Sequence, residues 1–176
     1  MEITLKEGPT LKICVASPED ADAVLAYVEK VSGESNFLTF GPGEFEMTVE
    51  QDAEYLRACH QSTNQIYILG FIDDALVATA HVGASPRARL RHCAELGMSV
   101  SRPFWGIGIG AAMLDYLIMW ARENPVLTKF DLRVRADNIR AISLYRARGF
   151  VEEGVLRKQF CVDGECYDLI AMGMDV

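Results

Sequence analysis

The feature that most restricts the fold of this chain is the order of elements between residues 93 and 135. A β-rich stretch at 93–100 leads into a glycine-rich turn, which is followed by an amphipathic helix at 108–123 and a second β-rich stretch at 130–135. Two strands joined by a helical crossover pair in parallel within one sheet. The sequence therefore predicts a sheet that contains a parallel pair and carries a helix on its face.

The flanking segments extend this unit into a larger mixed sheet. Asp73-Asp74 and Asp163-Gly164 each separate two β-rich runs, which is typical of a hairpin turn. The predicted strands are 11–16, 65–72, 75–82, 93–100, 130–135, 151–162 and 166–174, and the predicted helices are 17–31, 48–61, 108–123 and 138–148. We expect a single α/β (α+β mixed) domain over 1–176, with a twisted, mostly antiparallel sheet of about seven strands flanked by four helices.

Composition excludes several classes of function. Seventeen Lys and Arg against 25 Asp and Glu give a formal charge of −8, which repels a nucleic-acid backbone. The most apolar stretch, 103–121, is interrupted by Asp115, and the N-terminus lacks the pattern of a signal peptide. We therefore expect a cytoplasmic protein that binds neither nucleic acid nor membrane.

Cysteine and histidine spacing predicts neither a disulfide framework nor a metal site. The five cysteines are an odd number without a Cys-x-x-Cys pair, and the three histidines are scattered. Acidic residues gather at 44–54 and arginines at 133–148, and each run taken alone is most simply a solvated helix face.

The glycine-rich turn, Trp105-Gly106-Ile107-Gly108-Ile109-Gly110-Ala111, is the first candidate site. Alternating glycines leave backbone N–H groups uncovered at the start of a helix, where the dipole favours an anion such as a pyrophosphate. A tight turn that needs glycine only for close packing is the structural alternative. A Walker loop would need Gly-Lys-Ser/Thr where Gly110-Ala111 stands, and a dinucleotide fold would place its glycines in the first unit of a larger sheet, so both are disfavoured.

The second motif is Asn138-x-x-Ala141-x-x-Leu144-Tyr145-x-x-x-Gly149-Phe150, a helix capped by Asn138 and stopped by Gly149. With the glycine turn it resembles the GNAT superfamily of N-acetyltransferases, whose motif Arg/Gln-x-x-Gly-x-Gly/Ala corresponds to Trp105, Gly108 and Gly110. The resemblance implies a GNAT-like fold from residue 11 to the C-terminus, with acetyl-CoA as co-substrate and no metal. Trp105 replaces the usual Arg or Gln, so one side-chain contact to phosphate is in question while the N–H cradle remains.

The resemblance also implies site residues. Tyr145 would donate a proton to the departing coenzyme sulfur, and Glu95 would accept the proton of the amine, with His81 as the rival base. Each residue also has a purely structural interpretation: Tyr145 as a core tyrosine, Glu95 as a solvated glutamate of an edge strand, and His81 as a structural histidine. The backbone at 98–100 would pair with the pantetheine arm. The cofactor-binding set is Met98, Ser99, Val100, Trp105, Gly106, Ile107, Gly108, Ile109, Gly110, Ala111, Asn138 and Tyr145.

The chemistry of amine acetylation requires such groups. An amine with a pKa near ~10.4 is almost wholly protonated at pH 7, and its deprotonation costs about 4.6 kcal/mol. We expect direct transfer from acetyl-CoA to a primary amine in a ternary complex, because no cysteine occupies a motif position. The C-terminal residues 153–168 are similar to a branch that acetylates protein N-termini, polyamines and small amines, and we expect one of these as acceptor and a homodimer as the assembly. The alternative is a non-catalytic acyl-CoA-binding or sensor domain of the same fold, against which Tyr145 counts.

Overall fold

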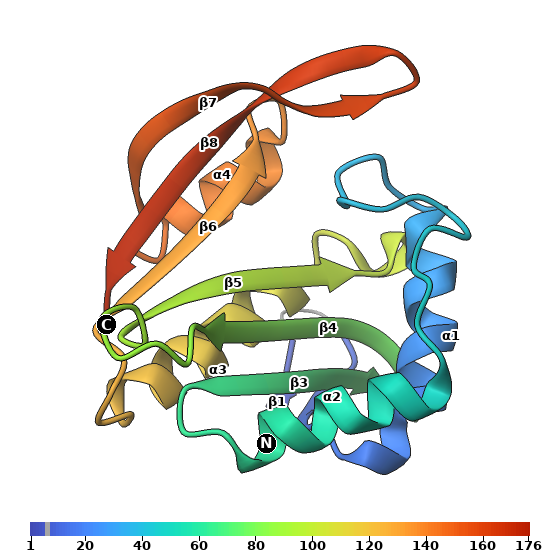
Figure 1. Ribbon diagram of the computed structural model, residues 1–176. Helices are drawn as coiled ribbons and strands as arrows, with labels where there is room; N and C mark the ends of the chain where they lie inside the picture. The colour runs from blue at the N-terminus through green and yellow to red at the C-terminus, as the bar shows by residue number, and fades with distance from the viewer. Residues whose placement is uncertain (6–7) are drawn as a thin grey trace.

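The computed structural model describes residues 1–5 and 8–176 and contains one sheet of eight strands (Figure 1). The spatial order is β1-β2-β3-β4-β5-β6-β8-β7, and only β5 and β6 pair in parallel. The predicted mixed sheet, its four helices and its parallel crossover are thus confirmed. The elements are β1 (Glu2–Thr4), β2 (Thr10–Val15), η1 (Pro18–Asp20), α1 (Ala21–Ser32), α2 (Val49–Gln61), β3 (Gln65–Ile72), β4 (Ala75–Ala84), β5 (Cys93–Val100), η2 (Arg102–Phe104), α3 (Ile109–Arg122), β6 (Lys129–Arg135), α4 (Ile139–Arg146), β7 (Val151–Val162) and β8 (Glu165–Asp175).

Local signals set the ends of these elements. Asp73 and Asp74 have φ of 47° and 62°, the positive values that a two-residue type I′ hairpin requires at both positions. At the start of α2, Thr48 Oγ1 accepts the N–H of Gln51 at 3.3 Å, and Gln51 Oε1 accepts the N–H of Thr48 at 2.9 Å. This reciprocal pair satisfies two N–H groups that the helix leaves free.

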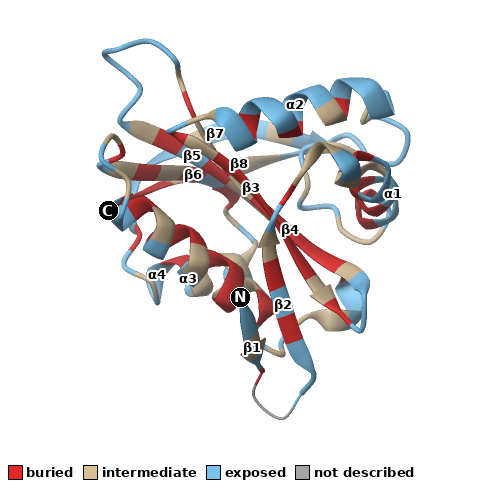
Figure 2. Cartoon of the chain, turned by 90° about the horizontal axis from the view of Figure 1, so that it is seen from below, coloured by how far each residue is buried: buried red, intermediate tan, exposed pale blue. Residues whose placement is uncertain are grey.

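Helices cover both faces of the sheet, and each face has its own core (Figure 1). Alternate residues of β4 point to opposite faces: Ala78, Ala80 and Val82 pack in the larger core under α3 and α4. The smaller core lies under α1 and α2. Figure 2 shows the outer side of α2 exposed, while the sheet side of α3 is buried.

Strands β5 and β6 separate after a short contact. Their pairing is confined to Cys93–Glu95 against Lys129–Asp131, although β5 continues to Val100 and β6 to Arg135. Figure 1 shows the two strands diverging from this point. Beyond Glu95, the edge of β5 that faces β6 consequently has no partner strand among the described residues, and the sheet opens into a V.

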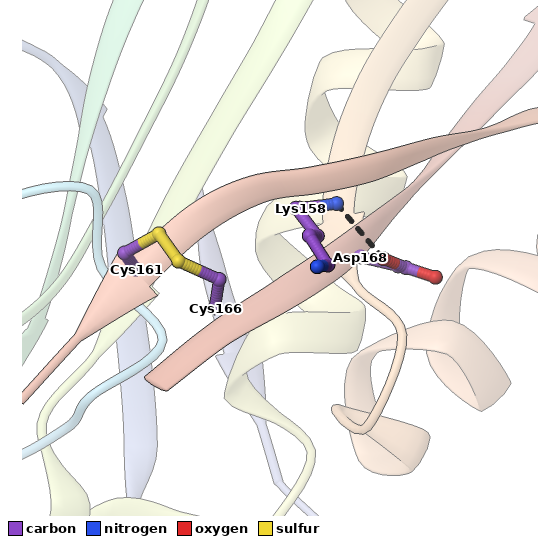
Figure 3. The surroundings of a disulfide bond; sticks show 4 residues. All are labelled: Lys158, Cys161, Cys166 and Asp168. Carbon is purple, nitrogen blue, oxygen red and sulfur yellow. Dashed lines mark hydrogen bonds between the residues drawn. A yellow bond between two sulfur atoms is a disulfide. The ribbon is translucent and has the colours of Figure 1, made fainter. Parts of the chain in front are cut away.

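Two features depart from the sequence predictions. The short strand β1 pairs with β2 and was not predicted, because three residues carry too little alternation to be recognised. The expectation that no disulfide forms is wrong: Cys161 and Cys166 lie opposite each other across the β7–β8 hairpin and are bonded (Figure 3). In the same hairpin Lys158 donates its N–H to Asp168 Oδ1 at 2.8 Å. Within residues 1–5 and 8–176, no helix has the length and apolarity needed to cross a membrane.

Candidate active site

A cleft of ≈ 1240 Å³ lies on the α1–α2 face of the sheet, and we call it the main cleft. Its floor is formed by side chains of β4, β5 and β6 that point to this face, among them His81, Glu95 and Arg133. Segment 33–48, between α1 and α2, forms one wall, and the β7–β8 hairpin forms the other. Tyr145 reaches the cleft from α4, on the opposite face of the sheet. The cleft thus connects the two faces through the V between β5 and β6.

Tyr145 occupies the position that the second motif predicts. The residue is 8% exposed, and its ring packs against that of Phe150 with centroids 5.6 Å apart. Burial raises the pKa of Tyr145 to about 12. The phenol is therefore protonated at neutral pH and can act as a proton donor toward a group held in the V.

Both candidate bases line the main cleft. Glu95 is exposed at the point where β5 and β6 part. The imidazole of His81 is stacked on the ring of Tyr67, with centroids 5.6 Å apart and an interplanar angle of 8°. A side chain at position 97 would collide with that imidazole, so Gly97 provides the space in which it lies. Burial lowers the pKa of His81, and its ring is neutral at pH 7.

A chain of hydroxyl groups links the floor of the cleft to α1. Ser99 Oγ lies 3.1 Å from both Tyr27 Oη and Thr79 Oγ1. The side chain of Ser99 is therefore held on the α1–α2 face, and its backbone pairs with Thr79 of β4. At the end of the strand, the carbonyl of Val100 accepts the indole N–H of Trp105 at 2.6 Å, so this carbonyl already has a partner.

The glycine turn has the shape of an open backbone cradle. Gly106 and Gly108 have φ of 88° and 100°, which side chains rarely tolerate. A side chain on Gly106 would meet nothing within 4 Å, whereas one on Gly110 would lie 3.3 Å from Leu144 of α4. The first two glycines thus shape and expose the turn, and Gly110 allows α3 and α4 to pack closely. Close packing, the structural alternative, accounts for Gly110, and the anion cradle stays a prediction for the exposed part of the turn.

Trp105 brings a basic residue to this turn. The guanidinium of Arg140, on the first turn of α4, lies over the indole with its carbon 5.2 Å from the ring centroid. Arg140 is exposed and has no ion-pair partner in the described part of the chain. Asn138, predicted to bind cofactor, caps α4 by accepting the N–H of Ala141 at 3.2 Å. Position 105, where the GNAT motif has Arg or Gln, therefore holds an indole ring on which the Arg140 guanidinium lies.

Arg135 was not singled out from the sequence, yet it joins the two walls of the main cleft. Its Nε and one terminal nitrogen donate to the carboxylate of Asp137 at 2.8 and 2.7 Å, and the other terminal nitrogen donates to the carbonyl of Asn36 at 2.8 Å. The guanidinium lies between Phe37 of segment 33–48 and Tyr167 of the hairpin, 4.5 and 3.9 Å from their centroids. Alternation along β6 gives the only sequence signal for this residue.

Asp52 is a second residue that sequence reasoning missed. It is 2% exposed and lies on the inner stripe of α2 with Leu56 and Cys59. Its Oδ2 is buried and has no hydrogen-bond partner among residues 1–5 and 8–176. The signal was a carboxylate at an i, i+4, i+7 position otherwise filled by apolar groups. Within those residues, no cluster of three or more His, Cys, Asp or Glu could hold a metal ion.

Comparison with known proteins identifies the family. The model of the acetyltransferase (GNAT) family matches residues 34–150, which contain the floor of the cleft and both motifs. The chain belongs to the GNAT family. An acetyltransferase of the GNAT family from Streptococcus pneumoniae is 29% identical in sequence, with a TM-score of 0.92 over 94% of this chain and 99% of that one. The GNAT fold that the two motifs predicted is confirmed.

Two further GNAT relatives carry names that state an acceptor. The L-amino acid N-acetyltransferase AaaT of Escherichia coli K12 is 27% identical over 60% of this chain, and the match spans 65% of that protein's length. The ribosomal-protein-alanine N-acetyltransferase of Brucella melitensis is 26% identical, with a TM-score of 0.80 over 94% of this chain and 99% of that one. Their named acceptors are an amino acid and a ribosomal protein, so they differ from each other.

Proposed function

We propose that this GNAT protein is an acetyl-CoA-dependent N-acetyltransferase that transfers an acetyl group to a primary amine. The observation that carries the proposal is the opening through the sheet: Tyr145 of the second motif lines the same cleft as Glu95 and His81. A proton donor and two proton acceptors thus lie around one opening. Acyl transfer to an ammonium needs both kinds of group.

Acetyl-CoA fits this opening from the α3–α4 side. The pyrophosphate would lie on the N–H groups of residues 106–111, and the pantetheine arm along the free edge of β5 at 98–100. Because the carbonyl of Val100 already accepts the indole N–H of Trp105, the arm would pair with the backbone of Met98 and with the N–H of Val100, which face the free edge. Arg140, held over Trp105, would supply the phosphate contact that an Arg or Gln at position 105 makes in other GNAT proteins.

The reaction would proceed by direct transfer of the acetyl group within a ternary complex. Glu95, or His81 as the alternative, accepts a proton of the acceptor ammonium, and the neutral amine attacks the thioester carbonyl. The carbon–sulfur bond then breaks, and the departing thiolate takes the phenolic proton of Tyr145. The remaining extra proton of the attacking nitrogen returns to the Tyr145 phenolate as the amide forms, and the base releases its proton to solvent. No covalent enzyme intermediate is proposed, because no cysteine lies in either motif. We further propose a cytoplasmic homodimer of one domain per chain, and sedimentation of the purified protein tests the dimer.

The alternative function is a domain that binds acyl-CoA without turnover. A thiol-release assay with acetyl-CoA, run with and without a panel of polyamines, amino acids, aminoglycosides and N-terminal peptides, separates the two. Thiol release that depends on one class of amine supports the enzyme. Tight binding of acetyl-CoA without amine-dependent release would identify a binding domain instead.

A further inference from the structure

The main cleft ends beneath α2 at a buried acidic residue, Asp52. The residue is 2% exposed, and its Oδ2 lacks a hydrogen-bond partner anywhere in the described chain. A buried polar group without a partner normally costs stability, so it requires an explanation. Stabilisation of the helix N-terminus does not explain it, because Glu50 supplies an exposed carboxylate to the same turn.

Aromatic rings surround this end of the cleft. Tyr55, one helical turn after Asp52, packs edge-on against Tyr67 with centroids 6.2 Å apart, and Tyr67 is stacked on His81. Burial, and to a smaller extent the charge of Asp52, raises the pKa of Tyr67 to about 12. A carboxylate beside neutral aromatic rings favours an organic cation, because the cation can pair with the carboxylate and contact the rings by cation–π interaction.

The charges of the cleft agree with a cation at this end. Burial raises the pKa of the Asp52 carboxyl, and no positive side chain of the described protein counteracts this effect. The two arginines of the cleft, Arg133 and Arg135, extend from β6, and Arg135 is already bound to Asp137. The subsite at Asp52 therefore has a carboxyl group without a cationic partner, and a bound cation would stabilise its charged form.

We propose that Asp52 and the adjacent rings of Tyr55 and Tyr67 bind a second cationic group of the acceptor, at a distance from the amine that is acetylated. This inference rests on the proposed function and names its substrate class: an aliphatic diamine or polyamine. Tyr67, His81 and Gly97 are registered neighbours on β3, β4 and β5, and strands lie about 4.8 Å apart. The subsite thus lies roughly 10 Å from the strand edge at which transfer would occur.

Two matched acceptors test this proposal: diaminoheptane and heptylamine, which differ only in the second amine. The thiol-release assay should give the diamine the higher kcat/KM. In Asp52→Asn, which keeps the shape and removes the charge, KM for the diamine should rise roughly 10- to 100-fold, with kcat and the heptylamine kinetics nearly unchanged. Glu50→Gln, on the exposed side of the same turn, is the control and should keep the diamine preference.

Direct binding separates this proposal from the proposed function. Calorimetry of diaminoheptane with the protein and free CoA should show binding that Asp52→Asn abolishes, even if no amine is acetylated. If the wild-type protein acetylates amines but Asp52→Asn keeps the same ratio of diamine to monoamine, the subsite is refuted and the transferase stands. If the asparagine variant does not fold, Asp52→Glu retains the charge and should retain the preference, and loss of the preference there would equally refute the subsite.

Discussion

Replacement of Tyr145 by Phe is the most informative single substitution at the proposed site. The change keeps the ring that packs on Phe150 in the core between α4 and the sheet, and it removes only the hydroxyl. Because the hydroxyl adds nothing to the apolar packing, the free energy of unfolding should change little. Any large effect on turnover then reports on the proton.

The magnitude follows from the pKa of the buried phenol. Burial raises the pKa of Tyr145 to about 12, against ~8.5 for a thiol, so full proton transfer to a thiolate is uphill by about 4.8 kcal/mol. The phenol therefore assists only while negative charge develops on sulfur, which is stabilisation of the transition state rather than of bound acetyl-CoA. General-acid assistance of this kind is worth at least roughly 10²-fold in rate.

Steady-state kinetics with the best acceptor amine, together with acetyl-CoA binding by calorimetry, checks this expectation. For Tyr145→Phe we expect kcat to fall roughly 10²-fold or more, while the Kd for acetyl-CoA and the melting temperature stay close to wild type. A kcat within twofold of wild type would show that Tyr145 is a core residue only. A matched loss of kcat and of acetyl-CoA affinity would point to misplacement of the coenzyme instead of a lost proton.

Three further substitutions test other parts of the site. Gly108→Asp places bulk and negative charge at the glycine turn and should weaken the binding of acetyl-CoA, measured by calorimetry. Asn tolerates the φ of 100° at this position as well as Asp does but carries no charge, so Gly108→Asn should bind acetyl-CoA more tightly than Gly108→Asp. Glu95→Gln should flatten the rise of kcat/KM with pH while acetyl-CoA still binds; a wild-type profile would favour His81, which is neutral above its lowered pKa. Arg140→Gln should raise the Kd for acetyl-CoA roughly tenfold or more, and the effect should shrink as the salt concentration rises. Arg146 lies on the same helix but pairs with Glu152, so Arg146→Gln is the control and should leave this Kd unchanged.

The sequence allowed the prediction of the elements that local chemistry determines. The hairpin turn at Asp73-Asp74, the helix predicted over 48–61 and the crossover between β5 and β6 each depend on a few adjacent residues, and each was found where expected. Tyr145 could be placed in the same way, because the cap at Asn138 fixes the register of α4.

Residues whose role depends on contacts between distant segments could not be predicted. Arg135 joins Asn36 and Tyr167, which are far apart in the chain, and Asp52 lies in an acidic run whose other members are exposed. The Cys161–Cys166 bond is different, because it is local: a two-residue turn at Asp163-Gly164 places these cysteines opposite each other, and cysteine counting did not use that register. Periodicity alone could nevertheless have shown that Asp52 faces inward.

The central claim is that acetyl-CoA and an amine react directly with each other in the opening between β5 and β6. Mass spectrometry of a reaction with acetyl-CoA deuterated in the acetyl group measures both products at once. The claim predicts that deuterated acetyl appears on the amine in equal amount to the free CoA formed, with none attached to the protein. Release of CoA that is independent of amine, or label on the protein that later passes to the amine, would contradict it.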